Sequence, residues 1–241
     1  MSRQSCKYGV VVRTMQSMCD RKSHMSIPAM LDLFQDIAGV HTDSLGIGVF
    51  DLEEKGLFWI VSKLKLKIAR RPRLGETLDA ATWMQPADRA TCERDWSVSE
   101  DGEQLAYLKS IWAVIGADNF KPARMSDFYP DIAYDIDRPD EEPFARIDKD
   151  FSKAERIGEY RVRSVDIDSG GHMSNANYVR AMLGFFSNAE IEEIKELDLR
   201  FLLQCYEGDT IRFVKRASKN GLMDIAAINS EGNVCFISTI K

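Results

Sequence analysis

Residues 165–179 read VDIDSGGHMSNANYV and predict a polar, glycine-rich turn that leads into a helix. Ser174 is a suitable N-cap, because its hydroxyl can accept a hydrogen bond from a backbone N–H of the first helical turn. Asp168 lies four residues before His172 and can fold back to orient its ring. Asp166 is expected to shape the turn. Helical spacing of apolar residues predicts a helix to about Ile194 that buries Tyr178, Val179, Met182, Phe185, Phe186 and Ala189.

The same pattern occurs earlier in the chain. Residues 20–26 read DRKSHMS and match DSGGHMS at 168–174 in their Asp, His, Met and Ser positions. A second run of helical spacing follows from Ile27 to about Leu45, where Gly46 and Gly48 end it. The repeat predicts one structural unit present twice. His24 is then either a second site or a copy without function, and His41 falls on the apolar stripe of the first helix as a core histidine.

Strand-like runs accompany both helices and predict an α+β fold. In the first half they cover residues 8–14, 58–68, 77–83, 91–99 and 104–115, and in the second half 156–165, 198–206, 209–217, 223–229 and 234–240. Residues 118–150 lack apolar periodicity and carry many acidic residues and four of the seven prolines. We therefore expect a first unit at 1–117, a linker at 118–150 and a second unit at 151–241.

Composition excludes several classes of protein. Apolar residues make up 44% of the 241 positions and charged residues 29%, as in globular proteins. No apolar run approaches the roughly 20 residues of a membrane span, and the amino-terminal residues show no apolar signal core, so a cytoplasmic protein is expected. A net charge of −6 does not suggest nucleic-acid binding. The five scattered cysteines suggest neither a disulfide framework nor a zinc site, and no ligand spacing suggests a metal or cofactor.

Residues 166–178 resemble the signature Asp-x-Asp-x-Asn-x-His-Val-Asn-Asn-x-x-Tyr of acyl-acyl carrier protein thioesterases, the plant FatA/FatB proteins and their bacterial relatives. The corresponding positions here are Asp166, Asp168, Gly170, His172, Met173, Ser174, Asn175 and Tyr178. The resemblance implies a double hot-dog fold of two tandem units, each with a long helix wrapped by a curved antiparallel sheet. It also implies hydrolysis of fatty acyl-acyl carrier protein to free fatty acid and carrier protein.

Two departures from the family pattern bear on the chemistry. Gly170 stands where the motif has Asn, and Gln204 stands where a strand of the second unit would carry Glu before Cys205. Losing that carboxylate removes a candidate general base, although an amide can still position a water. An acyl-coenzyme A thioesterase of the same fold and a non-catalytic acyl-binding protein therefore remain alternatives.

The expected chemistry is attack of water on a thioester. His172 serves as the base or holds the water, with Asp168 beside it. Cys205 is either a nucleophile or, as is commoner for a cysteine in a strand, a small buried residue. Backbone N–H groups around Gly171 and the helix start are expected to polarise the carbonyl. The residues expected to contact the substrate in this region are Gly170, Gly171 and Asn175.

Two further features concern the substrate. The family resemblance implies an acyl pocket in the first unit, where Met30, Phe34 and Trp59 either line the pocket or belong to the core. Acyl carrier proteins are acidic, so a basic surface should receive them. The candidate cluster comprises Lys63, Lys65, Lys67, Arg70, Arg71 and Arg73; a solvated sheet face or a protected strand edge explains it equally well. A monomer and a homodimer are both compatible with the sequence.

Overall fold

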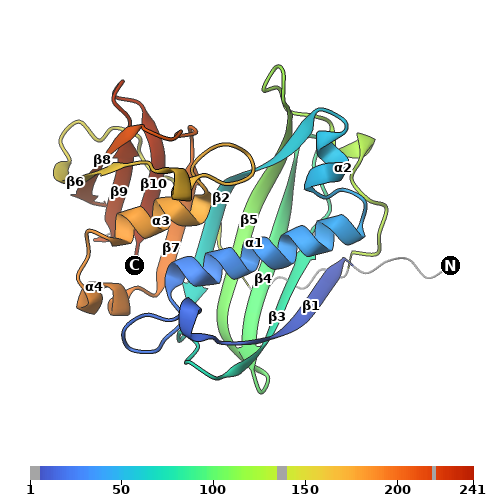
Figure 1. Ribbon diagram of the computed structural model, residues 1–241, viewed down its shortest axis with the longest axis horizontal. Coiled ribbons are helices and arrows are strands. Elements are labelled where there is room, and N and C mark those ends of the chain that lie inside the picture. The colour runs from blue at the N-terminus through green and yellow to red at the C-terminus, as the bar shows by residue number, and fades with distance from the viewer. Residues whose placement is uncertain (1–5, 135–139, 219–220) are drawn as a thin grey trace. The chain divides into compact units, whose positions relative to one another are not determined.

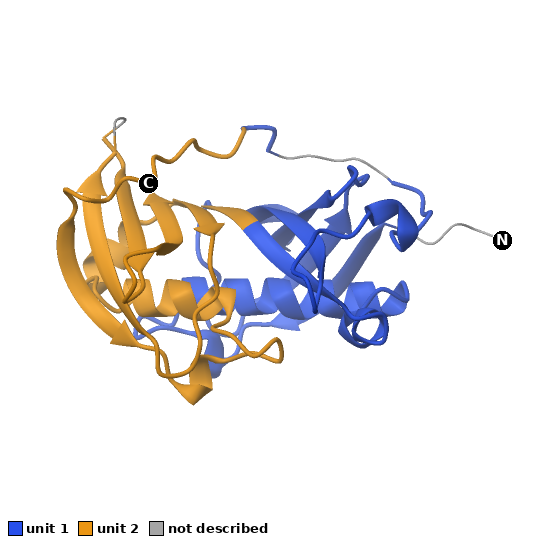
Figure 2. Cartoon of the chain, turned by 90° about the horizontal axis from the view of Figure 1, so that it is seen from above, with its two compact units in different colours: residues 1–62, 68–142 blue, residues 63–67, 143–241 orange. Residues whose placement is uncertain are grey.

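The computed structural model (Figure 1) describes residues 6–134, 140–218 and 221–241. The chain forms two compact units, coloured separately in Figure 2: residues 1–62 and 68–142 make up the first, and residues 63–67 and 143–241 the second. Strand β2 (Leu57–Ile68) therefore contributes residues to both units. Among the described residues, no helix combines the length and the apolar character that crossing a membrane requires.

The first unit contains an antiparallel sheet. Its strands are β1 (Lys7–Arg13), β3 (Thr77–Met84), β4 (Thr91–Glu100) and β5 (Glu103–Gly116), which pair in that order, and β2 follows β5. All five strands predicted for this half are confirmed to within one residue at each end. Their boundaries are predictable because glycine-containing turns separate runs of alternating apolar residues.

Helix α1 (Ile27–Ser44) lies across one face of this sheet (Figure 1). The Ser26 hydroxyl caps it by accepting a hydrogen bond from the N–H of Ala29 at 3.2 Å. Gly46 follows the helix with a φ of +70°, a conformation that glycine adopts without strain, so the predicted end is confirmed. The sequence did not predict the short helix α2 (Val49–Glu53), which starts after Gly48.

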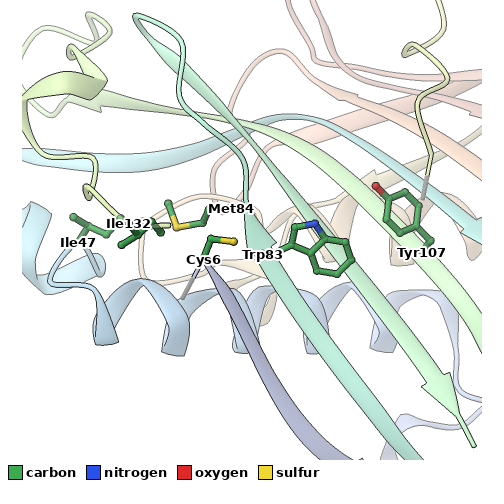
Figure 3. Packing of buried hydrophobic residues seen from close by; sticks show 6 residues of the cluster. All are labelled: Cys6, Ile47, Trp83, Met84, Tyr107 and Ile132. Atoms are coloured by element: carbon green, nitrogen blue, oxygen red, sulfur yellow. The ribbon is translucent and has the colours of Figure 1, made fainter. Parts of the chain in front are cut away.

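The core of the first unit is rich in aromatic and sulfur-containing side chains. The Phe34 ring of α1 packs against Trp96 and Trp112, with ring centroids 6.1 and 6.2 Å apart. Figure 3 shows a second cluster in the same unit, in which Cys6 and Met84 lie beside side chains from loops. The buried members of that cluster are Cys6, Ile47, Trp83, Met84, Tyr107 and Ile132.

The predicted linker packs partly against the first unit. Met125, in the 3₁₀ helix η2 (Met125–Asp127), is 1% exposed, and Ile132 is buried in the cluster of Figure 3. The first compact unit ends at Glu142, and Pro143 already belongs to the second. The apolar side chains near residues 125 and 132 explain why this segment adheres to the sheet despite its prolines. Residues 135–139 of the predicted linker lie outside the described residues.

The second unit also contains an antiparallel sheet. Residues 63–67 of β2 pair with β7 (Glu196–Phe201), and the order continues through β10 (Val234–Ile240), β9 (Met223–Ile228), β8 (Thr210–Ala217) and β6 (Glu155–Arg161). The first two strands of this half, β6 and β7, end earlier than predicted. Strand β6 ends at Arg161 because the 3₁₀ helix η3 (Ser164–Asp166) follows, and β7 ends at Phe201, so residues 202–206 are loop.

The helix of the second unit is also shorter than predicted. Helix α3 (Asn175–Leu183) stops at Gly184, and α4 (Asn188–Glu193) is a separate helix with a Ser187 capping box. The prediction of one helix to residue 194 is therefore wrong, and Phe185, Phe186 and Ala189 are not buried. The Phe185 ring instead packs on Phe213 and beside Gly158, where a Cβ would lie 2.1 Å from its Cε1 atom.

Helix α3 packs on the sheet of its own unit. The Tyr178 ring stacks on Phe236 of β10 at 5.4 Å and meets Phe201 of β7 edge-on at 6.0 Å. These contacts are of the kind that aromatic pairs favour. They fix the start of α3, and so the turn that precedes it, over the end of β7.

Candidate active site

The signature turn, residues 168–174, is held by its own backbone. The Asp168 N–H donates to the carbonyl of His172, and the Gly171 N–H donates to the carbonyl of Asp168, both at 3.0 Å. The Gly170 N–H donates to Asp168 Oδ1 at 2.8 Å. Gly171 has a φ of +79°, which explains the second glycine of the turn. Both glycine N–H groups donate within the turn, so a part for N–H groups around Gly171 and the helix start in polarising a thioester carbonyl stays a prediction.

Asp166 anchors the entry to this turn, as predicted. Its carboxylate accepts hydrogen bonds from the Tyr160 hydroxyl at 2.9 and 2.8 Å and from the Arg163 N–H at 2.8 Å. Its carbonyl accepts from the side-chain amide of Asn177 at 3.0 Å. The Ser174 hydroxyl accepts from the N–H of Asn177 at 3.2 Å, so the predicted N-cap is confirmed.

His172 and Asp168 meet at the surface of the turn. His172 Nδ1 lies 3.6 Å from Asp168 Oδ1, and the two side chains are 20% and 41% exposed. The histidine ring lies over Gly170, because a Cβ at position 170 would be 2.7 Å from His172 Cε1. The glycine that departs from the family pattern is therefore the residue that leaves room for the ring in this orientation.

The loop after β7 lies beside the signature turn. Its Cys205 carbonyl accepts a hydrogen bond from the Met173 N–H at 2.8 Å. Two residues flank that contact: the Tyr206 hydroxyl donates to Gln204 Oε1 at 2.9 Å, and the Tyr206 ring meets the His172 ring edge-on with centroids 6.4 Å apart. The structure thus brings His172, Asp168 and Gln204 into one region, with Tyr206 among them. Sequence reasoning missed Tyr206 because no motif marks it.

Cys205 differs from its neighbours in being fully buried, with 0% exposure. A hydrogen bond with Cys235 lowers the pKa of the Cys205 thiol, and burial acts in the opposite direction. The same hydrogen bond and burial raise the pKa of Cys235. The buried thiol supports the prediction of a small core residue rather than that of a nucleophile.

The turn of the first unit, residues 20–26, repeats the signature turn in its backbone. The Asp20 N–H donates to the His24 carbonyl at 2.8 Å, and the Ser23 N–H donates to the Asp20 carbonyl at 3.0 Å. Asp20 Oδ1 accepts from the Lys22 N–H at 2.8 Å. Ser23 stands in place of Gly171 and has a φ of +61°, which costs a residue with a side chain some strain. The repeat read in the sequence is confirmed.

The turns at residues 20–26 and 168–174 differ in the partners of their aspartate side chains, Asp20 and Asp168. Asp20 Oδ2 accepts from Arg71 Nη1 at 2.7 Å, and the arginine side chain is 8% exposed. Burial raises the pKa of Asp20, but hydrogen bonds with His24, Lys22 and Arg71 outweigh it and hold that pKa below its ordinary value. Because Arg71 binds the Asp20 carboxylate, the structure supports the interpretation of His24 as a copy without function.

His41 is a core residue, as predicted. It is 2% exposed on α1, and its ring stacks on Tyr8 with centroids 5.7 Å apart. Its Nδ1 atom lies 3.1 Å from Nη1 of Arg94, which is itself buried. Burial lowers the pKa of Arg94.

The residues expected at an acyl pocket are packed into the first unit. Met30 and Phe34 are at most 1% exposed. Trp59 packs edge-on against Trp112 at 6.0 Å, and its indole N–H donates to the Ile47 carbonyl at 2.9 Å. These contacts are those of a core, and a pocket at these residues stays a prediction.

The lysines expected to receive a carrier protein do not form an open face. Lys65 is 4% exposed and lies 3.5 Å from Glu196. Lys63 Nζ lies 5.8 Å from the centre of the Phe144 ring, and Lys67 is half-buried opposite Glu196 in the strand register. Phe144, within the predicted linker, lies beside this strand, and Lys65 is buried against Glu196, so Lys65 is not available for docking, contrary to the prediction.

The arginines of the same predicted cluster are mostly engaged within the first unit. Arg70 pairs with Glu76 at 2.8 Å and with Glu100 at 2.5 Å, and these hydrogen bonds raise its pKa. Arg71 is held by Asp20, and Arg73 is exposed. Docking at Arg70 and Arg73 stays a prediction, whereas the burial of Arg71 argues against its part in it.

Two units, each with a helix packed on an antiparallel sheet, are the architecture of a double hot-dog protein. The sequence matches the acyl-ACP thioesterase N-terminal domain over residues 7–133 and the acyl-ACP thioesterase C-terminal domain over residues 149–235. The chain belongs to the acyl-ACP thioesterase family.

Two solved structures share the fold. An acyl-ACP thioesterase from Bacteroides thetaiotaomicron is 20% identical with a TM-score of 0.81, covering 97% of this chain and 96% of its own. The 12:0-ACP thioesterase from Umbellularia californica is 17% identical with a TM-score of 0.86, covering 100% of this chain and 98% of its own. At these identities the likeness concerns the fold alone, and it confirms the predicted α+β double hot-dog class.

Curated relatives are plant proteins. An acyl-[acyl-carrier-protein] hydrolase of Cuphea viscosissima is 25% identical over 209 residues, which cover 78% of this chain and 50% of the relative. Oleoyl-acyl carrier protein thioesterase 1 of Arabidopsis thaliana is 22% identical over 207 residues, which cover 77% of this chain and 57% of the relative. Both are chloroplastic. The chain spans about half the length of the curated relatives it matches.

Proposed function

We propose that the protein hydrolyses fatty acyl-acyl carrier protein to a free fatty acid and the carrier protein. Family membership supports the reaction class. The observation that carries the proposal for this chain is the placement of His172, which is partly exposed between the Asp168 carboxylate and the Tyr206 ring. Such an imidazole has access both to solvent and to an orienting carboxylate.

In the proposed mechanism His172 takes a proton from a water molecule as the water attacks the thioester carbonyl carbon. Asp168 orients the ring and stabilises the positive charge that the ring gains. Its present distance of 3.6 Å is longer than a hydrogen bond, and such contacts commonly tighten when substrate binds. Collapse of the tetrahedral intermediate breaks the C–S bond, and the proton passes from His172 to the departing thiolate, which gives the thiol of the carrier's phosphopantetheine arm.

The carbonyl oxygen gains negative charge during this step and needs donors nearby. The N–H groups of Gly170 and Gly171 are engaged within the turn. The first turn of α3, which begins at Asn175, offers N–H groups that the helix itself cannot satisfy. We therefore assign a polarising role to the start of α3, with Asn175 the residue nearest to the substrate there.

Cys205 distinguishes the water mechanism from a covalent one. We expect Cys205→Ala to keep kcat within about threefold of the unaltered protein, because the buried thiol takes no part in the water mechanism. Steady-state hydrolysis measures this, and thermal unfolding shows whether the smaller side chain has loosened the core. A fall of roughly 10³-fold in kcat with an unchanged unfolding temperature would instead identify Cys205 as the nucleophile.

The substrate test compares carriers directly. The protein is assayed with acyl-acyl carrier protein and acyl-coenzyme A over a series of chain lengths, and we expect kcat/KM to be at least about tenfold higher for the carrier protein. Equal values on both carriers would favour the acyl-coenzyme A alternative. Saturable acyl binding without release of fatty acid would favour the acyl-binding alternative. A cytoplasmic location and a homodimer stay predictions.

A further inference from the structure

Tyr206 is the one aromatic side chain whose ring contacts His172 among the described residues, and its hydroxyl reaches Gln204. We propose that Tyr206 is a positioning residue that holds the Gln204 amide with its NH₂ group available as a hydrogen-bond donor to the reacting thioester. This inference rests on the proposed hydrolysis. It gives Gln204 a role different from that of the glutamate which the family resemblance leads one to expect.

The hydrogen bond between the two side chains decides which end of the amide is available. A glutamine carries one acceptor oxygen and an NH₂ group with two donors. The Tyr206 hydroxyl donates to Gln204 Oε1 at 2.9 Å, which engages the oxygen. No protein group within residues 6–134, 140–218 and 221–241 accepts a hydrogen bond from Gln204 Nε2, although the side chain is half-buried. The donor end is therefore the end left for a ligand.

The backbone of the loop fixes this pair next to the histidine. The Tyr206 N–H donates to Asp209 Oδ2 at 2.8 Å, which closes the loop after β7. The carbonyl of Cys205, between the two residues, accepts from the N–H of Met173 at 2.8 Å, and Met173 follows His172. Gln204 and Tyr206 are thus attached to the signature turn through the residue between them, which fixes their backbone positions relative to the turn that carries His172.

The chemistry of the amide sets the role. A glutamine cannot take a proton from water at ordinary pH, so Gln204 does not replace a glutamate as a base. A fixed donor stabilises the negative charge that develops on a carbonyl oxygen, and removing one such donor commonly costs roughly 10²- to 10³-fold in kcat. Tyr206 acts on the reaction through the amide, and its own hydroxyl does not need to touch the substrate.

The test is a double-mutant cycle in kcat and KM on acyl-acyl carrier protein. We expect Gln204→Ala to lower kcat by roughly 10²-fold, and Tyr206→Phe to lower it by about tenfold with KM unchanged, because the donor acts in the transition state. In the Gln204→Ala background, Tyr206→Phe should change kcat by less than about twofold, since no amide remains to be positioned.

The matched control is Tyr134→Phe, which removes a hydroxyl that donates to the Pro130 carbonyl at 2.9 Å in the first unit and should leave kcat unaltered. In ¹⁵N spectra of the free protein, Tyr206→Phe should shift the side-chain NH₂ signals of Gln204. An equal effect of Tyr206→Phe in both backgrounds, or a change in KM alone, overturns the positioning role and leaves the proposed hydrolysis intact. A complete lack of hydrolysis by the unaltered protein overturns both.

Discussion

Replacing His172 with alanine is expected to lower kcat on acyl-acyl carrier protein by roughly 10²- to 10⁴-fold, the contribution of a general base. The ring is the base in the proposed mechanism, whereas Arg71 engages the carboxylate beside His24 and His41 is buried. The unfolding temperature should change little, because the side chain is partly exposed and the turn is held by backbone hydrogen bonds. Steady-state kinetics and thermal unfolding measure the two quantities.

His24→Ala is the matched control for this change. It occupies the same place in the same backbone turn, but Arg71 engages the neighbouring carboxylate. We expect its kcat and KM to equal those of the unaltered protein. If both alanine variants lost activity to the same extent, the loss would reflect damage to the turn, and the assignment of His172 as the base would fail.

Restoring the family residue at position 170 is expected to reduce activity. In Gly170→Asn the new Cβ would lie 2.7 Å from His172 Cε1 and 3.1 Å from Asp168 Oδ1, so the ring has to leave its place. A displacement of about 1 Å in a reacting group can cost on the order of 10²-fold in rate, and we expect a loss of that size in kcat. Stability should be nearly unchanged, because a histidine side chain can rotate away.

Two variants check the cause of that loss. Gly39→Ala adds a Cβ on α1 that meets no heavy atom within 4 Å beyond the local backbone, and it should retain full activity. Adding Gly170→Asn to His172→Ala should have no further effect, since the ring it displaces is absent. An increase in kcat for Gly170→Asn would mean that the ring works from a different position, and the geometry proposed for the reaction would be wrong.

The sequence alone specifies much of this fold because its signals are local. The helix caps at Ser26 and Ser174 and the glycine after α1 act within one helical turn. The residues that determine where each helix begins or ends therefore lie close together in the sequence. The strands of the first unit are separated by turn residues for the same reason. The signature turn and its copy were found because four residue types recur in register.

The errors arose where distant segments decide the outcome. Lys65 alternates with leucines, as an exposed lysine would. In the structure, Glu196 from another strand pairs with Lys65, and the Phe144 ring lies beside Lys63. Apolar spacing continues past Leu183 although the helix does not, because Phe185 packs over Gly158 on the sheet. No local pattern reveals such partners. Tyr206 was missed for this reason, since its significance depends on contacts with Gln204 and His172.

The aspartates of the two turns have different partners, and this difference bears on the number of reaction centres per chain. Arg71 neutralises Asp20 in one copy, whereas Asp168 in the other copy keeps its histidine neighbour. If the proposed mechanism holds, a polypeptide built from two similar halves offers one reaction centre, and we expect each chain to process a single acyl group at a time. A pair of identical hot-dog subunits, in contrast, would present two equivalent centres related by symmetry.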